Sequence, residues 1–322
     1  MIQVENLTKK YSVVKALDNV SFTINKGDIV GFLGPNGAGK STTMNIITGY
    51  LSMTSGKVTI NGHDIVNDAG KAKQSIGYLP EHPPLYLDMT PYEYLSFLCD
   101  LKKVKLNRKK HIEEICELVK LGDMKNRLIK KLSKGYRQRV GIAGALVGNP
   151  DILILDEPTV GLDPNQIIEI RKLIKSLSRE HTIILSSHIL SEIEAVCKRI
   201  IVINGGKIIA DATAEDLIEK YGEQNILFAD ITGVPALVQP ILTSLHGVKK
   251  CTKVGGDDIS TKFRLVIEDG CDIREEIFKS IENSGNSLVG LYKNQPTLEE
   301  IFTLLTTTEI KDTEKEEKGE EK

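Results

Sequence analysis

The sequence lacks a long apolar run, a secretory leader and any close pair of cysteines. Its apolar stretches, such as Ile152–Leu155 and Ile200–Ile203, are far shorter than the roughly 18 residues that a membrane helix requires. The N-terminus shows no basic-plus-apolar pattern, and the five cysteines are widely spaced without a C-x-x-C motif. These absences argue against a membrane span, secretion, a disulfide framework and a zinc site. We therefore expect a soluble cytoplasmic protein with reduced cysteines.

The sequence also lacks an excess of charge of one sign. Its 42 Lys and Arg residues are balanced by 44 Asp and Glu residues, which gives a net charge of −2. We expect no nucleic-acid partner, because proteins that bind nucleic acid present a basic surface. The 322 residues are enough for two domains with sizeable cores, and the chain shows no internal repeat.

Alternating strand and helix patterns in the first two thirds of the chain predict an α/β fold. Strand-like segments at 2–4, 20–24, 29–33 and 57–60 are followed by a helical pattern from about 91 to 148. Segments 151–155 and 182–185 are continuous apolar runs, typical of parallel strands that are buried on both faces. Such a fold binds its ligand at the carboxyl ends of the strands.

The last third of the chain has a different pattern. Segments 226–231, 235–245, 248–253, 263–267, 272–283 and 287–292 read as strand, helix, strand, strand, helix and strand. This order predicts a small α+β ferredoxin-like C-terminal domain over residues 222–308. Dimer stabilisation is the role we favour for it, with regulation of turnover or binding of a small effector as alternatives. Residues 309–322 are almost entirely Glu and Lys and are predicted to form a disordered charged tail.

A phosphate-binding loop is the most informative motif. It follows the apolar run 29–33, precedes a helix-compatible segment and satisfies G-x-x-x-x-G-K-[ST], which makes a chance glycine-rich turn a poor explanation. Its glycines let backbone N–H groups surround a polyphosphate, and the helix N-terminus adds its positive dipole end. Lys40 is expected at the β- and γ-phosphates and the Ser41 hydroxyl at Mg²⁺. The predicted nucleotide-binding residues are Gly34, Pro35, Asn36, Gly37, Ala38, Gly39, Lys40, Ser41 and Thr42.

Two adjacent carboxylates end the apolar strand 152–155. Asp156 is predicted to lie near the metal ion, and Glu157 beside the γ-phosphate, where it polarises an attacking water. The alternative is a buried strand capped by two solvated acids.

The order of these motifs resembles one family, the ATP-binding cassette ATPases. Gly161-Leu162-Asp163-Pro164 is similar to the D-loop of that family, and Ser186-Ser187-His188 to its switch histidine. The resemblance covers residues 1 to about 220. It implies a P-loop NTPase cassette over residues 1–221, with a RecA-like core, an antiparallel β subdomain and a helical subdomain at about 85–148. Within the family the chain most resembles single-cassette subunits of the sodium-efflux, multidrug and gliding-motility type.

The resemblance implies further site residues. His188 would hold Glu157 and the attacking water in line, with a neutral or a charged ring, and Tyr11 would stack on adenine; the alternatives are a structural histidine and a surface tyrosine. Ser133 and Gly135 lie in the segment Leu132–Arg139, which resembles the family signature. They would bind the γ-phosphate of an ATP molecule held by the other subunit, with Asp163 of the D-loop nearby.

The chain departs from the family pattern at two places. The signature reads Leu-Ser-Lys-Gly-Tyr where Leu-Ser-Gly-Gly-Gln is usual, and two interpretations of Lys134 stay open: a cation near phosphate, or a side chain that points to solvent. Glu81 stands where the family normally has Gln. Its carboxylate can still bind Mg²⁺ or accept a hydrogen bond from water, but it loses the amide donor and adds negative charge.

We therefore expect a Mg²⁺-dependent ATPase, with ATP and Mg²⁺ as cofactors, that drives transport through separate membrane-spanning permease subunits. The resemblance implies a homodimer that closes on two ATP molecules, peripheral on the inner face of the cell membrane. A contact surface for the permease is expected around Tyr86, Leu87 and Met89, although these residues would equally suit an ordinary helical core. The alternatives are a soluble cassette ATPase that acts on ribosomes or DNA, and a regulatory module without turnover.

Overall fold

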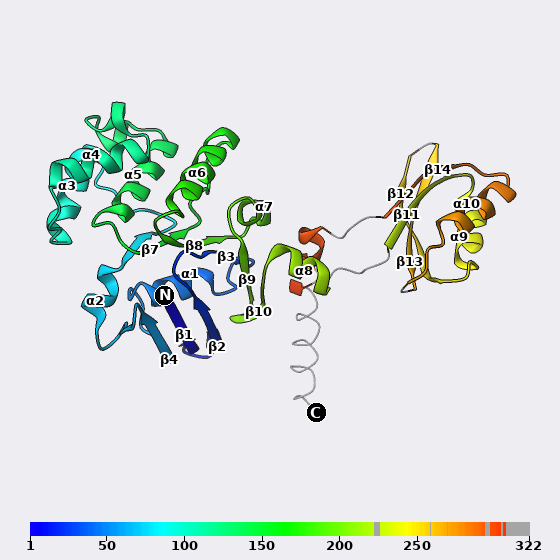
Figure 1. Ribbon diagram of the computed structural model, residues 1–322, viewed down its shortest axis with the longest axis horizontal. Coiled ribbons are helices and arrows are strands. Elements are labelled where there is room, and N and C mark those ends of the chain that lie inside the picture. Colours follow the sequence, from blue (N-terminus) through cyan, green and yellow to red (C-terminus); the bar gives the residue numbers. More distant parts are fainter. Residues whose placement is uncertain (222–225, 258, 269, 294–296, 304, 307–322) are drawn as a thin grey trace. The chain divides into compact units, whose positions relative to one another are not determined.

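The computed structural model describes residues 1–221, 226–257, 259–268, 270–293, 297–303 and 305–306. These residues fall into two compact units, with the division after Ala214 (Figure 1). The predicted charged tail, 309–322, lies outside the described residues. In the described part of the chain, no helix combines the length and the hydropathy that crossing a bilayer demands.

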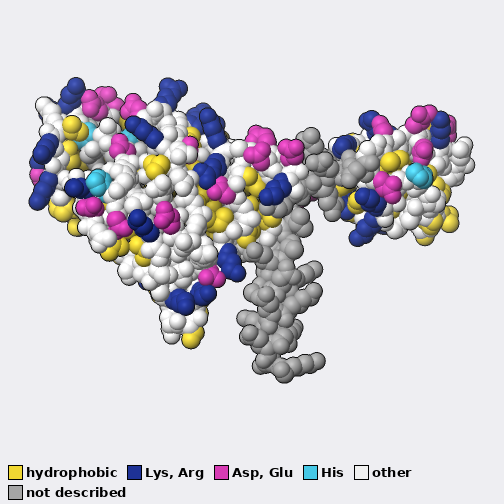
Figure 2. Space-filling view, turned by 60° about the horizontal axis from the view of Figure 1, so that its bottom comes forward, with side chains coloured by type: hydrophobic (Ala, Val, Ile, Leu, Met, Phe, Trp, Pro, Cys, Tyr) yellow, Lys and Arg dark blue, Asp and Glu magenta, His cyan; other side chains and the backbone are white. Residues whose placement is uncertain are grey.

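Charged side chains of both signs share the surface. On the face that Figure 2 displays, Lys and Arg side chains of the first unit are interspersed with Asp and Glu side chains. This mixing agrees with the near-zero net charge of the sequence and gives that face no basic stripe.

The first unit opens with an antiparallel sheet in the order β2-β1-β4-β5. Ile2 and Val4 of β1 are both buried, because alternate residues of a strand point to the same face. An irregularity in the pairing with β2 between Val4 and Leu7 breaks the alternation, and Leu7 is buried as well. The antiparallel subdomain of the predicted cassette is thus confirmed. Its strands are β1 (Ile2–Tyr11), β2 (Val14–Ile24), β4 (Ser55–Ile60) and β5 (His63–Asp64).

A six-stranded sheet in the order β10-β9-β3-β8-β7-β6 forms the centre of the first unit. The five strands from β9 to β6 run parallel, and β10 pairs antiparallel with β9. Strands β7 and β8 are buried along their whole length, as their continuous apolar sequences predict. The carboxyl ends of β3, β8 and β7 therefore lie side by side. The strands are β3 (Ile29–Leu33), β6 (Ile76–Leu79), β7 (Ile152–Asp156), β8 (Thr182–Ser187), β9 (Arg199–Asn204) and β10 (Lys207–Ala212).

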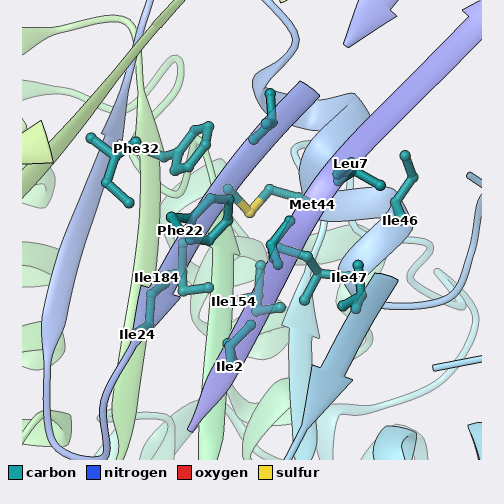
Figure 3. Close-up of a cluster of buried hydrophobic side chains, with 14 of the residues drawn as sticks. Ile2, Leu7, Phe22, Ile24, Phe32, Met44, Ile46, Ile47, Ile154 and Ile184 are labelled. Atoms are coloured by element: carbon teal, nitrogen blue, oxygen red, sulfur yellow. The ribbon is translucent and has the colours of Figure 1, made fainter. Parts of the chain in front are cut away.

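One hydrophobic core joins the two sheets through α1 (Lys40–Ile47). Helix α1 contributes Met44, Ile46 and Ile47 to this core (Figure 3). The packing fixes α1 directly behind the phosphate-binding loop. The labelled side chains from the strands are Ile2, Leu7, Phe22, Ile24, Phe32, Ile154 and Ile184.

Helices α3, α4 and α5 form the helical part of the first unit and fall within the predicted range 85–148. Helix α3 starts at Pro91, as predicted, and Thr90 and Glu93 close a capping box at its N-terminus. The helices of the first unit are α2 (Ala69–Gln74), α3 (Pro91–Leu101), α4 (Arg108–Leu118), α5 (Lys134–Leu146), α6 (Pro164–Leu177) and α7 (Leu190–Glu194), with short 3₁₀ helices at Gly122–Met124 and Ile129–Lys131.

The second unit is an antiparallel sheet in the order β12-β13-β11-β14, packed against α9 and α10 through an apolar core. This order, in which the first strand pairs with the third and the fourth, confirms the predicted ferredoxin-like domain. Helix α8 (Ala214–Tyr221) groups with this unit. The remaining elements are β11 (Ile226–Thr232), α9 (Pro235–Thr243), β12 (Val248–Gly256), β13 (Ser260–Ile267), α10 (Arg274–Asn283) and β14 (Leu288–Lys293).

Candidate active site

The phosphate-binding loop connects β3 to α1 and needs glycine at two crowded positions. A Cβ atom at Gly34 would lie 2.3 Å from the carbonyl oxygen of Ile203. Gly39 has a φ of 110°, and a Cβ atom there would lie 2.7 Å from Leu17 Cδ2. Both glycines therefore let the loop approach its neighbours closely, as their places in the motif predict.

The Lys40 ammonium lies across the inside of this loop. It donates hydrogen bonds to the carbonyl oxygens of Gly34 and Pro35, at 2.8 and 3.2 Å, and lies 3.8 Å from Glu157 Oε1. Burial lowers the pKa of Lys40, while the neighbouring carboxylates of Glu157 and Asp156 oppose that shift. A buried cation is thus placed at the strand ends, where the motif predicts a phosphate-binding lysine.

Asp156, the last residue of β7, points toward the start of α1. The hydroxyl groups of Ser41 and Ser186 both donate to its Oδ1, the former over 3.4 Å. Burial raises the pKa of Asp156, and the two hydroxyl donors and Lys40 act in the opposite direction. The predicted pair of oxygen ligands, Ser41 and Asp156, is therefore brought together by the structure.

Glu157 is held in an uncommon backbone conformation at the carboxyl end of β7. Its φ is 48°, and its N–H donates to Ser186 of the adjacent strand β8. Both carboxylate oxygens lie 3.0 Å from His188 Nδ1. Because a carboxylate only accepts hydrogen bonds, this contact assigns the proton to Nδ1. The two predicted catalytic residues are thus in direct contact.

A cavity of about 540 Å³ opens in front of these groups. Glu81, whose side chain is 44% exposed, reaches the same cavity from the loop after β6. Nucleotide phosphates placed here would meet the loop, the ammonium, two carboxylates and an imidazole. The lining residues are Asn36, Gly37, Gly39, Lys40, Ser41, Thr42, Glu81, Glu157, Val160 and His188.

Ser133 and Gly135 are predicted site residues that do not line this cavity. Ser133 is exposed and caps α5, where its Oγ accepts from Tyr136 N over 3.4 Å. Gly135 is buried, and a Cβ atom there would lie 2.4 Å from Gln166 Oε1. Asp163 also lies outside the cavity and caps α6 by accepting from Gln166 N over 2.9 Å.

The position of the Lys134 side chain bears on its two interpretations, a cation near phosphate or a side chain that points to solvent. Its ammonium lies against the D-loop, since a Cβ atom at Gly161 would be only 1.9 Å from Lys134 Nζ. Gly161 has a φ of 69°, so the glycine of the D-loop provides both the turn and the space for this lysine. Lys134 is exposed, but its side chain extends toward the D-loop of its own chain.

Tyr11 is 48% exposed at the end of β1, and it does not line the cavity. The ammonium of Lys9 lies over its ring at 5.0 Å from the centroid, a cation–π contact. Stacking of adenine on Tyr11 stays a prediction.

Comparisons with known proteins agree with this site. A family model described as "ABC transporter" matches residues 17–160. The linearmycin resistance ATP-binding protein LnrL of Bacillus subtilis (strain 168) is 33% identical over 97% of this chain and 100% of that protein. The chain belongs to the ABC transporter ATP-binding proteins. The bacitracin transport ATP-binding protein BcrA of Bacillus licheniformis is 41% identical over 67% of this chain and 71% of that protein.

The fold of this ABC ATPase is similar to those of solved ATP-binding cassettes. A dimeric ATP-binding cassette in a post-hydrolysis state, bound to ADP and Pi, has a TM-score of 0.61 and 29% identity. It aligns with 66% of this chain and 98% of the other. The chain is therefore an ATP-binding and ATP-hydrolysing subunit of an ABC transporter, and its cassette fold is the predicted one.

Several residues that hold the site of this ABC ATPase were not predicted as site residues from the sequence. Ser186 contacts both Asp156 and the N–H of Glu157, and Glu192 of α7 accepts hydrogen bonds from Thr159 and Ser187. One signal was present in the sequence. Glu192 lies between Leu190 and Ile193, which a short helix buries together with it, and a carboxylate on a buried face needs polar partners.

The residues around the phosphate-binding loop fit a magnesium ion. Ser41 and Asp156 offer hard oxygen atoms beside the cavity, with the Glu81 carboxylate on its rim. In the part of the chain that the structure describes, no cluster of three or more His, Cys, Asp or Glu side chains could hold a metal ion alone. Mg²⁺ is usually held by one or two carboxylates together with substrate phosphates and water.

Proposed function

We propose that this ABC ATPase works as a homodimer that closes on two ATP molecules. The observation that supports this most directly is the position of Ser133, which is exposed at the start of α5 and outside the cavity of its own Lys40. A hydroxyl at a helix N-terminus suits a phosphate, and a second copy of the chain supplies that phosphate. Ser133 and Gly135 of one copy then face the nucleotide bound by the loop of the other, with Asp163 at the same interface.

Within each site, Glu157 polarises the attacking water and His188 keeps the carboxylate in place. The Nδ1–H of His188 donates to Glu157, which leaves the other ring nitrogen for the γ-phosphate side. Lys40 carries a positive charge to the β- and γ-phosphates in a buried setting, where charge stabilisation is strong. Ser41, Asp156 and Glu81 are the residues that would hold Mg²⁺, which when bound neutralises phosphate charge. Tyr11 is assigned to the adenine ring.

The membrane-spanning partner is proposed to dock beside the loop that follows β6. Tyr86 and Leu87 are about half exposed, and the rings of Tyr94 and Phe97 pack against Tyr86. A cavity of about 650 Å³ lies beside this aromatic group, between the Glu81–Pro84 loop and α3, and it also reaches Ser41 and Asp156. A permease helix seated here touches the loop that carries Glu81, and Met89 borders the same segment.

We also propose a location for the chain and a role for each of its two domains. The chain sits on the inner face of the cell membrane with residues 1–221 as the ATPase domain. Residues 222–308 form an accessory domain that favours dimer formation. Ribosomes or DNA are not favoured as partners, because the net charge of −2 gives the chain no excess of basic residues.

The names of two relatives suggest the kind of compound that is moved. One is named for linearmycin resistance and the other for bacitracin transport. We propose that the transporter exports compounds of this kind. A host strain that expresses the chain with its permease should tolerate higher doses of one of them, whereas a Lys40→Ala version should not. Equal tolerance of the two strains would contradict this substrate class.

Dimer formation is tested with a Glu157→Gln background, in which bound ATP persists. Sedimentation with ATP should show a dimer, and adding Ser133→Ala should shift it toward monomer by at least tenfold in the dimerisation constant. Ser133→Ala in the otherwise native chain should also lower turnover. Ser52→Ala, at an exposed serine in the loop before β4, is the matched control. If Ser133→Ala leaves both ATP-driven pairing and turnover unchanged, the proposed arrangement is wrong.

A further inference from the structure

Glu192 on α7 is a buried carboxylate beside the catalytic residues but outside the nucleotide cavity. Glu192 is only 4% exposed, and it does not line the cavity. Its Oε2 accepts two hydrogen bonds, from Thr159 Oγ1 at 2.6 Å and from Ser187 Oγ at 2.9 Å. Among the described residues no cation forms an ion pair with it. Burial of an unpaired carboxylate is costly, so these two hydroxyl donors are its main compensation.

The two donors come from the two chain segments that carry the catalytic pair. Thr159 follows Glu157 by two residues, and Ser187 directly precedes His188. These segments leave the neighbouring parallel strands β7 and β8, whose last paired residues are Asp156 and Ser186. A single carboxylate oxygen therefore ties the loop that bears Glu157 to the loop that bears His188.

Two further hydrogen bonds join Ser187 and Glu192 through the backbone of Ile189. Ser187 Oγ also accepts from Ile189 N at 3.0 Å, and Glu192 N donates to the carbonyl oxygen of Ile189 at 3.2 Å. Thr159 and Ser187 are themselves buried, so their hydroxyl groups are shielded from bulk solvent. Glu157 itself has a positive φ, a conformation that persists only where neighbours hold it.

We propose that Glu192 is a positioning residue for ATP hydrolysis. It fixes the distance between the Glu157 carboxylate and the His188 ring by holding both of their loops, and it does not line the nucleotide cavity. This inference rests on the proposed roles of Glu157 and His188. A misplacement of about 1 Å in such a pair is enough to cost on the order of 100-fold in rate.

The test compares Glu192→Ala with Glu192→Gln in the full chain. Glu192→Ala should lower kcat by on the order of 10- to 100-fold, while KM for ATP stays within about threefold. Glu192→Gln keeps an oxygen that accepts from the two hydroxyl groups, and should retain kcat within about fivefold of the native chain. Glu194→Ala is the matched control, since Glu194 lies on the same helix but is exposed.

Thr159 supplies a second, independent pair of variants. Thr159→Val keeps the shape of the side chain but loses the hydroxyl donor, so it should lower kcat. Thr159→Ser keeps the hydroxyl and should retain the kcat of the native chain. Because both act through one contact, Glu192→Ala combined with Thr159→Val should be no slower than Glu192→Ala alone. Binding of a fluorescent ATP analogue, measured without turnover, reports whether the nucleotide site itself is intact.

The outcomes separate this inference from the proposed function. If Glu192→Ala turns over ATP like Glu194→Ala while Glu157→Gln is inactive, Glu192 has no positioning role. A parallel loss of ATP binding, thermal stability and turnover in Glu192→Ala, without rescue by Gln, would show a purely structural role. Equal turnover of Glu157→Gln and the native chain would instead overturn the proposed mechanism, and the inference with it.

Discussion

The two units of the molecule treat buried polar groups in opposite ways. In the described part of the first unit, buried side chains include charged or polar groups at the ends of β3, β7 and β8, among them Lys40, Asp156, Glu157 and Glu192. In the described part of the second unit, Thr261 is the one buried polar residue. Its core is otherwise apolar, built from residues such as Phe263, and its charged residues stay at the surface.

This difference shows which unit carries the free-energy cost of buried charges. Burying a charge costs free energy unless partners compensate for it, so a fold retains such groups mainly where chemistry requires them. The strand ends of the first unit hold an ammonium and three carboxylates within a network of hydroxyl donors. The second unit meets the simpler requirement of an apolar core, which fits an accessory role.

The largest expected effect comes from exchanging a carboxylate for an amide in each unit. Glu157→Gln removes the group that polarises water and should lower ATP turnover by about 10³-fold, because general-base catalysis contributes about 10²- to 10⁴-fold. Asp230→Asn, in the sheet of the second unit, should change turnover by less than about twofold. Steady-state phosphate release measures both. A comparable loss in Asp230→Asn would place chemistry in the second unit and break the comparison.

The next effect concerns the apolar core of the second unit. Phe263 is fully buried, so Phe263→Ala should destabilise that unit by about 3–5 kcal/mol. Urea unfolding, followed by hydrogen exchange in β11 and β13, measures the loss, and ATP turnover per cassette should stay within about twofold at saturating protein. Phe278→Ala is the control, because Phe278 on α10 is 51% exposed. A large fall in turnover at saturating protein would show that the units are coupled in catalysis.

What the sequence predicted well was local. The phosphate-binding loop and the strand that ends in Asp156 and Glu157 are contiguous patterns, and strand burial explains their placement at one edge. The C-terminal order of strands and helices was likewise readable from alternation. The network around Glu192 was not, because it joins Thr159, Ser187 and a short helix through contacts that exist only after β7 and β8 pair.

The position of Lys134 illustrates the same limit. Its departure from the family signature was visible in the sequence, but its direction was not. Only the fold brings Lys134 against Gly161, since the rest of α5 and the whole of β7 lie between these two residues along the chain. Contacts between a motif and a distant turn need tertiary structure to be found.

A smaller effect is expected at Glu81, the acidic residue on the rim of the cavity. Its side chain is 44% exposed, so unlike Asp156 and Glu157 it is solvated, and an amide oxygen can replace its carboxylate as a ligand or acceptor. Glu81→Gln should keep ATP turnover within about tenfold, with a shift in the Mg²⁺ concentration that gives half-maximal rate. Titration with Mg²⁺ at fixed ATP measures both. Complete loss of turnover would show that the carboxylate itself is needed.

The smallest effect concerns His111, a buried polar residue of the first unit that lies away from the active site. It sits on α4, and its Nε2 accepts from Gly148 N over 3.0 Å, which requires a neutral ring. Burial lowers the pKa of His111 below its ordinary value of 6.5; Lys102 adds to that shift and Glu114 opposes it. His111 therefore tests whether a buried titratable group with a backbone partner contributes to stability and not to catalysis.

The sign of its pH dependence follows from the lowered pKa. The unfolded chain binds the proton more readily, so the contribution of His111 is complete above about pH 6.5 and is lost as the pH falls through the lower folded value, by at most about 1.4 kcal/mol per pH unit. His111→Gln keeps an acceptor for Gly148 and should flatten this loss between pH 7.5 and pH 5 in urea unfolding, while His82→Gln, at an 89% exposed side chain, should not. Turnover at pH 7.5 should be the same in all three proteins. Equal acid sensitivity of His111→Gln and the native chain would contradict the assignment, and a change in turnover would bring this buried residue into the catalytic set.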